Sequence, residues 1–348
     1  MRQVRICIYG GTDLGGTPTN FISALAYEIL KAIPGTIIVT GGFLHSNDKP
    51  EAKSTDVAAL EGARLYAKKN GADLKECFEA WIPEPTLDKR PEVNDAVRMK
   101  ESDGITVRVM KGRTPLGRRL AMVAGVDFVI TISGKIHTEV VIEQTLELGL
   151  PVLPIPNAGG DSQKLLAEHK ERIAAGFEPG ALDKCLADVS KWIGEDDKLA
   201  ARAVVSLIKR AKLGKCLVLF PFDDEHDVLY KSVIEPAVAK HMIPLRLDHL
   251  PRSDAIYSSF ADSIRTAAAV IADITVLNEN VMYEIGYAHG LGLKPLLYTR
   301  TEERLGDLPV YFRTLNVRLE SKTTPLSLLI DEYLTSFKEA RGIRQARQ

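Results

Sequence analysis

Residues 4–16, with the sequence VRICIYGGTDLGG, decide the fold of the N-terminal half. Residues 4–9 are largely apolar and rich in β-branched side chains, which is typical of a buried strand. The glycines that follow favour a tight loop, and TPT at residues 17–19 is typical of a helix start. Apolar side chains recur at helical spacing over residues 21–33, and TIIVT at residues 36–40 is another apolar run. This order predicts a parallel strand–helix–strand unit.

The same alternation of apolar runs and helical patterns recurs along the rest of the chain. Further strands are predicted at residues 126–132, 151–155, 216–221, 243–247, 268–274 and 295–298. We therefore predict an α/β fold with two doubly wound, Rossmann-like parallel-sheet domains joined by a helical segment. The expected bounds are 1–190 for the first domain, 191–214 for the helical linker and 215–348 for the second domain.

The composition excludes several classes of protein. The 348 residues include 45 lysines and arginines against 46 aspartates and glutamates, and this balance argues against a large nucleic-acid surface. No apolar run approaches the roughly 18 residues that span a bilayer, and the N-terminus lacks a signal-peptide pattern. The cysteines Cys7, Cys77, Cys185 and Cys216 lie too far apart for a CxxC site or a disulfide framework. We expect a cytoplasmic protein with no membrane or nucleic-acid partner.

Several glycine-bearing loops follow predicted strands of the first half. Gly10 and Gly11 follow the first strand, Gly41 and Gly42 follow the second, and Gly134 follows the strand that ends at residue 132. In a doubly wound sheet these loops lie at the carboxyl ends of the strands, where ligands bind. Glycine lets the backbone approach a phosphate closely, and a helix N-terminus favours the anion. The first loop alone fits a tight turn equally well, but several such loops at one edge favour a nucleotide pocket.

Because of these glycine-bearing loops, roughly residues 1–175 resemble the SLOG superfamily. It includes the LOG-type phosphoribohydrolases, DprA-like proteins and the STALD sensor domains of bacterial defence systems. LOG enzymes carry PGGxGTxxE, whereas this chain has SGKIHTEVVIE at residues 133–143, which fits better the members that only bind a nucleotide. The resemblance implies a nucleotide-binding set of Gly10, Gly11, Thr12, Gly41, Gly42, Arg113, Gly134, Thr138 and Glu139.

Two members of that set have a second interpretation. Arg113 belongs to a cluster with Arg108, Arg118 and Arg119, which could hold phosphate or form a solvated basic face. Glu139 could orient a ribose hydroxyl or simply occupy the first turn of its helix, where a carboxylate is favoured.

The second half carries its chemistry in residues 271–293, IADITVLNENVMYEIGYAHGLGL. A strand is predicted to end at Asp273, and Asn280 is predicted to cap a helix that begins at Val281. Glu284 would then lie in the first turn, where the helix dipole keeps its carboxylate ionised. Two carboxylates with neighbouring amides suit cleavage of an N-glycosidic bond, because a carboxylate must stabilise or attack the developing oxocarbenium carbon. The alternative is that Asp273 is a turn residue at the end of the strand and that Glu284 is a charge favoured near the start of the helix.

These residues resemble the nucleoside 2-deoxyribosyltransferase-like and TIR-like superfamily. The family's ADLT, NPNV and YELGYAH segments correspond here to ADIT at residues 272–275, NENV at 278–281 and YEIGYAH at 283–289, after LFPFD at 219–223 in place of its MPF strand end. Glu279 stands where the family usually has proline, which could alter the choice of substrate. The resemblance covers about residues 215–320. It implies a catalytic set of Glu284, Asp273 and Asn278, with Glu284 as the catalytic carboxylate. It also implies a substrate-binding set of Phe220, Pro221, Phe222, Asp223, Asn280 and Tyr283. The acidic run at residues 223–227 suits a helix N-terminus, and we expect no metal site there.

Together, the resemblances imply a nucleotide-sensing bacterial defence effector. A signal nucleotide would bind the first domain, and the second domain would hydrolyse the N-glycosidic bond of NAD⁺. NAD⁺ would be the substrate of this reaction, and we expect that no cofactor is required. We also expect a homo-oligomer, because TIR-type activity usually depends on association. Two alternatives stay open: a metabolic nucleoside or nucleotide N-glycosidase or 2-deoxyribosyltransferase, and a non-catalytic nucleotide-binding regulator.

Overall fold

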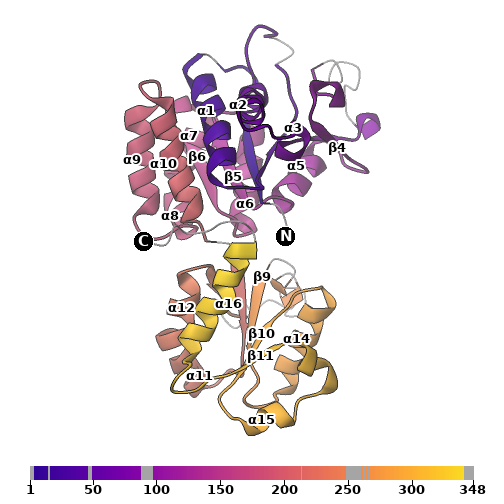
Figure 1. Cartoon of the computed structure of the whole chain (residues 1–348), viewed down its shortest axis with the longest axis vertical. Coiled ribbons are helices and arrows are strands. Elements are labelled where there is room, and N and C mark those ends of the chain that lie inside the picture. Colours follow the sequence, from indigo (N-terminus) through magenta and orange to yellow (C-terminus); the bar gives the residue numbers. More distant parts are fainter. Residues whose placement is uncertain are drawn as a thin grey trace. The chain divides into compact units, whose positions relative to one another are not determined.

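The computed structural model describes residues 4–14, 16–45, 49–87, 97–212, 214–247, 260–261, 263–264 and 267–340. Within these residues the chain divides into two compact units, one that runs to Ala211 and one that comprises Lys212–Glu339 (Figure 1). Each unit contains one sheet, and every strand pair in both sheets is parallel. The predicted α/β fold with two Rossmann-like sheets is therefore confirmed.

The first sheet has six strands in the order β4-β3-β2-β1-β5-β6. Their bounds are β1 Arg5–Gly10, β2 Ile37–Thr40, β3 Phe78–Pro83, β4 Thr106–Met110, β5 Phe128–Ile132 and β6 Val152–Ile155. The central strands are buried on both faces, which explains why they read as continuous apolar runs. The chain leaves β1 toward β2 but leaves β5 toward β6, so the carboxyl ends of β1 and β5 form the topological switch point.

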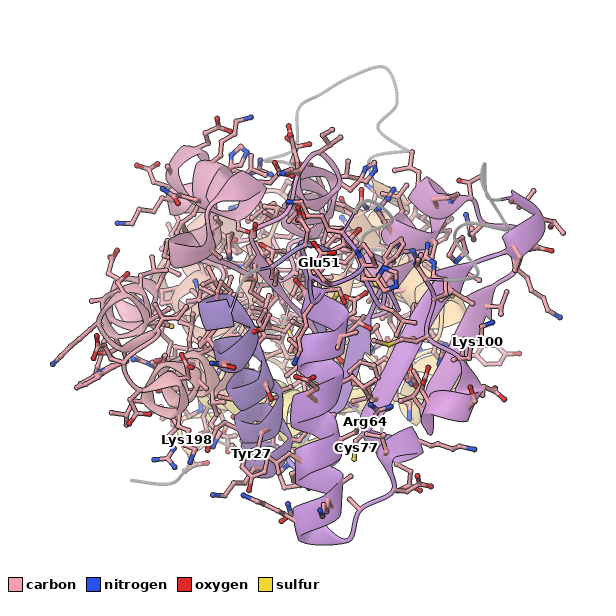
Figure 2. All side chains as sticks on the ribbon, turned by 90° about the horizontal axis from the view of Figure 1, so that it is seen from above. Tyr27, Glu51, Arg64, Cys77, Lys100 and Lys198 are labelled. Atoms are coloured by element: carbon pink, nitrogen blue, oxygen red, sulfur yellow. The ribbon has the colours of Figure 1, made fainter. Side chains whose placement is uncertain are left out.

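Helices cover this sheet. Their bounds are α1 Gly16–Ala32, α2 Thr55–Asn70, α3 Leu74–Cys77, α5 Pro115–Ala124, α6 His137–Glu147, α7 Gly160–Glu168, α8 Lys170–Ala175, α9 Ala181–Trp192 and α10 Asp197–Lys209. Short 3₁₀ turns lie at Pro85–Leu87, Glu101–Asp103 and Pro156–Ala158. Figure 2 shows α1 and α2 side by side, with Tyr27 on α1 and Arg64 on α2.

The helix α10 falls in the range where we predicted a linker. It packs against α1 and α9, and Nε of Arg202 lies 3.3 Å from Oε2 of the buried Glu28 on α1. One face of α10 is apolar and buried, including Val204 and Ile208. The helix is therefore part of the first unit.

The second sheet has five strands in the order β11-β10-β9-β7-β8. Their bounds are β7 Lys215–Leu219, β8 Ile243–Leu245, β9 Ala267–Asp273, β10 Leu296–Thr299 and β11 Asn316–Leu319. The helices are α11 Asp224–Leu229, α12 Glu235–Ala239, α14 Glu279–Gly290, α15 Glu303–Gly306 and α16 Leu326–Ala340, with a π-helical turn at Tyr230–Ile234 and a 3₁₀ turn at Val310–Thr314. Its switch point lies between the carboxyl ends of β7 and β9.

The cysteines and the helices bear on two expectations drawn from the composition. All four cysteines are buried and none forms a disulfide, as their spacing predicted. Across the described part of the chain, no helix combines the length and apolar character needed to cross a bilayer.

Candidate functional site

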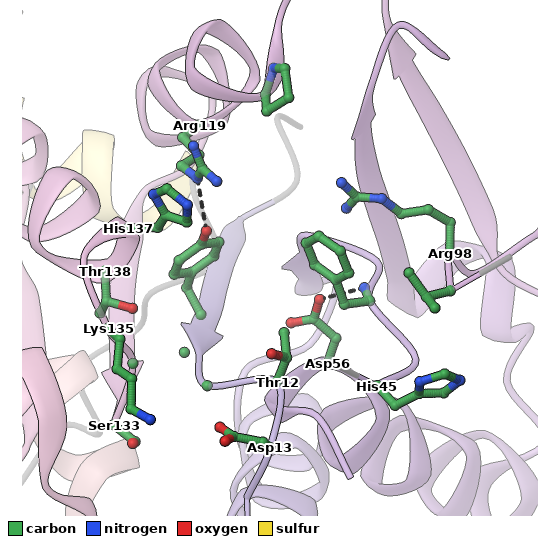
Figure 3. Close-up of a pocket in the computed structure, with 17 residues that line it drawn as sticks. Thr12, Asp13, His45, Asp56, Arg98, Arg119, Ser133, Lys135, His137 and Thr138 are labelled. Atoms are coloured by element: carbon green, nitrogen blue, oxygen red, sulfur yellow. Dashed lines mark hydrogen bonds between the residues drawn. The ribbon is translucent and has the colours of Figure 1, made fainter. Parts of the chain in front are cut away.

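A cavity of about 520 Å³ lies at the switch point of the first sheet. This is within the size range of small-molecule sites in proteins. Figure 3 shows the side chains around it. The lining residues are Tyr9, Gly10, Gly11, Thr12, Asp13, Phe43, His45, Asp56, Val97, Arg98, Pro115, Arg119, Ser133, Gly134, Lys135, His137 and Thr138.

The loop after β1 is held close to β5 and to the start of α2. Gly11 N donates to the carbonyl of Ile132 at 3.1 Å, and the carbonyl of Gly11 accepts from both N and Oγ1 of Thr55. A Cβ on Gly10 would lie 2.0 Å from the oxygen of Ile132, so only glycine fits this position. The close approach leaves the loop backbone as one wall of the cavity.

The loop after β5 has an unusual backbone. Ser133 and Ile136 both have φ of 58°, which non-glycine residues rarely adopt. At Ile136, ψ is -53° and His137 N donates to the carbonyl of Lys135, so the three residues form a γ-turn of the rare, strained kind. Such strain gathers at ligand-binding loops, where the surrounding structure holds it in place.

Cationic side chains gather on the β5 side of the cavity. Thr114 caps α5 by accepting from Gly117 N, and Pro115 begins the helix. Arg119, one turn further, donates from Nε to the hydroxyl of Tyr9 at 3.0 Å, and both side chains are buried. The cavity walls desolvate the imidazole of His137 and, together with the Arg119 charge, lower its pKa below the usual value. The charges of Arg119 and Lys135 suit an anion, and the neutral imidazole of His137 can donate one hydrogen bond to it.

The opposite side of the cavity carries a buried carboxylate. Asp56, in the first turn of α2, accepts at Oδ2 from Phe43 N at 2.7 Å, just beyond the end of β2. Burial raises the pKa of Asp56 to about 6, although the Phe43 amide and the charges of Arg118 and Arg98 oppose the shift. The guanidinium of Arg98 lies 3.6 Å from the centroid of the Phe43 ring and donates to the carbonyl of Gly41 at 2.7 Å.

The cavity contains five of the nine residues of the predicted nucleotide-binding set, namely Gly10, Gly11, Thr12, Gly134 and Thr138. Four do not line it. Gly41 and Gly42 precede Phe43 in the loop after β2, where the Gly41 carbonyl accepts from Arg98 and the Gly42 carbonyl accepts from Met99 N. Arg113 is exposed outside the cavity, and the Glu139 amide is bound by Asp161 of α7 at 3.2 Å.

Several residues that line the cavity were not predicted from the sequence as site residues. These are Tyr9, Phe43, Asp56, Arg98, Lys135 and His137, with Arg119 recognised only as a member of a cluster. The helix start TPLGRR at residues 114–119 could have favoured Arg119 over Arg113, because Thr114 and Pro115 place Arg119 inside the helix. No local pattern identifies Asp56 or Arg98, which reach the cavity through the order of the strands.

In the second unit, residues 220–223 follow β7 and Asp273 ends β9, so both lie at the switch point. Asp273 is buried, and its Oδ1 accepts from Thr275 N at 2.7 Å. Its Oδ2 lies 3.5 Å from Nε2 of His226 and 3.6 Å from Nη2 of Arg300, without a hydrogen bond from any described residue. The sequence pattern therefore placed Asp273 correctly at a strand end.

His226 and Arg300 connect the strand ends of the second sheet. Nδ1 of His226 lies 2.7 Å from Oδ1 of Asp223, and its ring stacks on Phe220 at 5.9 Å. Arg300 follows β10 and pairs through Nη1 with Glu225 at 2.6 Å. The sequence analysis placed Asp223 in the substrate-binding set but gave His226 and Glu225 no role beyond a helix start, because their partners Asp273 and Arg300 lie about 50 to 75 residues away.

The helix α14 begins earlier than predicted. Asn278 is its N-cap, since Oδ1 accepts from the amides of Asn280 and Val281, so the prediction that Asn280 caps the helix is wrong. Asn280 is exposed in the first turn, and Glu284 therefore lies in the second turn. Burial raises the pKa of Glu284 to about 7. This differs from the expected ionised carboxylate, because desolvation outweighs the helix dipole one turn further from the end.

The remaining predicted residues surround this helix and the β7 loop. Phe222 is 60% exposed and Tyr283 is 55% exposed, so both rings are available to a ligand. Phe220 is buried in the stack with His226, and Pro221 lies between the two phenylalanines. Among the residues that the structure describes, no group of three or more His, Cys, Asp or Glu side chains could hold a metal ion.

Comparisons with known proteins give a fold likeness only. No family model and no curated protein matches the chain. Among solved structures, the molybdenum cofactor binding protein from Rippkaea orientalis is 19% identical, with 49% of this chain and 87% of that chain covered and a TM-score of 0.33. DNA processing protein A from Helicobacter pylori is 18% identical, with 49% and 73% covered and a TM-score of 0.31. The molybdenum cofactor carrier protein from Chlamydomonas reinhardtii is 17% identical, with 50% and 99% covered and a TM-score of 0.28. Likenesses at this level carry no argument about function.

Proposed function

We propose that the first unit binds a nucleotide in the switch-point cavity. The observation that carries this proposal is the position of the cavity, between the glycine loop after β1 and the strained loop after β5. Ligands of open α/β sheets bind at this point because backbone amides and helix N-termini converge there. Arg119 and Lys135 supply the charge that phosphate requires.

Isothermal titration calorimetry of the full chain with a panel of nucleotides tests this proposal. We expect at least one nucleotide to bind, and Arg119→Ala to weaken its binding by about tenfold or more, the scale of a lost charge-assisted hydrogen bond. Arg172→Ala is the matched control, because Arg172 pairs with Glu147 on the surface. Failure of every nucleotide to bind would overturn the proposal.

We further propose that the second unit hydrolyses an N-glycosidic bond, with NAD⁺ as the substrate. The support is the switch-point position of Asp273, the exposed rings of Phe222 and Tyr283, and the half-buried Glu284 carboxyl group. The bond between C1′ and the nicotinamide nitrogen breaks, and neutral nicotinamide leaves. Glu284, as a carboxylate, stabilises or attacks the oxocarbenium carbon, and the buried Asp273 positions His226 and Arg300 at the strand ends. Water then adds to C1′ and releases a proton.

The test is product analysis of the purified full chain with NAD⁺ and with nucleoside monophosphates, with and without the ligand of the first unit. We expect nicotinamide release that Glu284→Gln abolishes and Glu303→Gln, on the exposed α15, leaves intact. Release of base from the monophosphates with NAD⁺ untouched would instead indicate a metabolic N-glycosidase or deoxyribosyltransferase. No release from any substrate would indicate a non-catalytic regulator. The defence role and the homo-oligomer stay predictions, and light scattering tests the latter.

A further inference from the structure

The two sides of the first-unit cavity differ in charge and in shape. Arg119, Lys135 and His137 lie on one side, and Asp56 and Arg98 lie on the other (Figure 3). The Arg98 guanidinium stacks on the ring of Phe43. The second side also carries the Arg98 guanidinium, but the Gly41 carbonyl engages it at 2.7 Å, so an inorganic anion would use mainly the first side. A carboxylate in a cavity wall disfavours an anion next to it, so it requires a ligand part that donates hydrogen bonds.

Asp56 lies near the end of the second strand, where other α/β folds place a carboxylate that binds ribose. In dinucleotide-binding folds, an acidic residue at the end of the second strand accepts hydrogen bonds from ribose hydroxyls. Here no acidic residue directly follows β2, but Asp56 reaches the same place from α2. Its Oδ2 is bound by Phe43 N, the third residue after β2, at 2.7 Å.

The start of α2 is also fixed to the glycine loop that would meet the phosphate. Thr55, next to Asp56, donates from N and from Oγ1 to the carbonyl of Gly11 at 2.9 and 3.0 Å. The carboxylate and the glycine loop are therefore parts of one rigid wall. Rigid positioning of this kind lets a carboxylate discriminate between a hydroxyl and a hydrogen on the ligand.

Beyond Asp56, the cavity offers a wall built from two planar groups. The Phe43 ring is stacked on the guanidinium of Arg98 at 3.6 Å, and the guanidinium is itself held by the Gly41 carbonyl at 2.7 Å. Planar aromatic and guanidinium surfaces are the ones on which nucleobases stack. The cavity thus presents, in order, an anion side, a carboxylate and a stacking wall.

We propose that Asp56 binds the ribose hydroxyls of the nucleotide, so that the first unit selects ribonucleotides with a free 2′-hydroxyl over 2′-deoxy and 2′-phosphorylated ones. This inference rests on the proposed nucleotide binding by the same cavity. The 2′-hydroxyl donates to the carboxylate, the 5′-phosphate faces Arg119 and Lys135, and the base lies against Phe43. A 2′-phosphate is rejected because it brings like charge to Asp56.

Calorimetry on the unmodified full chain tests the inference without relying on a variant. The probes are the four ribonucleoside 5′-monophosphates, ADP-ribose, the 2′-deoxy counterparts of the monophosphates and adenosine 2′,5′-bisphosphate. We expect at least one ribonucleotide to bind at least tenfold more tightly than its 2′-deoxy or 2′-phosphate form. Equal binding of the matched forms overturns the inference but leaves nucleotide binding intact. No binding by any probe overturns both.

Variants identify the residue responsible. Asp56→Asn should bind the 2′-deoxy form as the unmodified chain does but lose the tenfold preference for the ribo form. Asp183→Asn, an equal change of charge at an exposed pair with Lys170, should keep the preference. A preference that survives in a folded Asp56→Asn protein, as judged by circular dichroism, overturns the assignment to Asp56.

Discussion

Nε of Arg119 donates a hydrogen bond to the hydroxyl of Tyr9 at 3.0 Å, which joins α5 to β1 at the wall of the cavity. Tyr9→Phe removes the acceptor and leaves a buried guanidinium nitrogen without its partner. We expect the free energy of unfolding to fall by about 1–3 kcal/mol, as for other unsatisfied buried donors. Urea denaturation measures this change. An unchanged midpoint would show that solvent replaces the tyrosine hydroxyl.

The Gly134 position tolerates no side chain. Its φ is +89°, and a Cβ there would lie 1.9 Å from Oγ1 of Thr138. Gly134→Ala should therefore cost about 3 kcal/mol or more, the sum of left-handed strain and overpacking. Gly35→Ala is the matched control, because Gly35 has φ of +76° with no atom within 4 Å of the new Cβ and should cost only about 1–2 kcal/mol. Similar losses of stability in both variants would contradict the steric argument.

The raised pKa of Glu284 predicts a pH profile for the proposed hydrolysis. Burial raises this pKa to about 7, so the carboxylate form gains population as the pH rises through 7. We expect kcat/KM for NAD⁺ to rise about tenfold per pH unit below that value and to level off above it. Steady-state kinetics between pH 5 and 9 measure the profile. A rate that falls as pH rises would mean that Glu284 acts in its protonated form.

Asp56 makes the stability of the chain depend on pH. Its pKa is raised from 3.8 to about 6 by burial, so the folded state holds the proton more tightly than the unfolded state. The resulting stability is fully present below about pH 4 and is lost as the pH rises through about 6, by up to about 3 kcal/mol. Urea denaturation at pH 4.5 and 7.5 should show a smaller loss in Asp56→Asn. An identical loss in both proteins would exclude Asp56 as its origin.

His226 and Asp273 should be energetically coupled. Nε2 of His226 lies 3.5 Å from Oδ2 of Asp273, and both side chains are buried. A double-mutant cycle with His226→Ala and Asp273→Asn should give an interaction of about 0.5–3 kcal/mol in the free energy of unfolding, as for other residues that share a network. The same cycle with Asp331→Asn in place of Asp273→Asn should be additive, because Asp331 pairs with Lys240 and His241 instead. Additivity in the His226–Asp273 cycle would show that the two residues do not act together.

The sequence predicted the parts of each site that depend on local order. Gly10, Gly134 and Asp273 were found because each follows an apolar run and precedes a helical pattern, and a parallel sheet brings such positions to one edge. The N-cap of α14 was placed two residues late, because Asn278 and Asn280 are both good caps and only the backbone geometry chooses between them.

The sequence by itself determined the α/β class, since the spacing of apolar residues reports local secondary structure. Only the tertiary structure decided which charges meet. Asp56 and Arg98 lie 42 residues apart, and Asp273 lies 47 residues from His226 and 27 from Arg300, yet each set gathers at one switch point. The order of the strands in each sheet brings these residues together. Strand order depends on packing between segments that are distant in the chain rather than on sequence neighbours. Packing likewise decided the protonation of Glu284, because its burial raises its pKa to about 7 and no sequence pattern states how deeply a carboxyl group is buried.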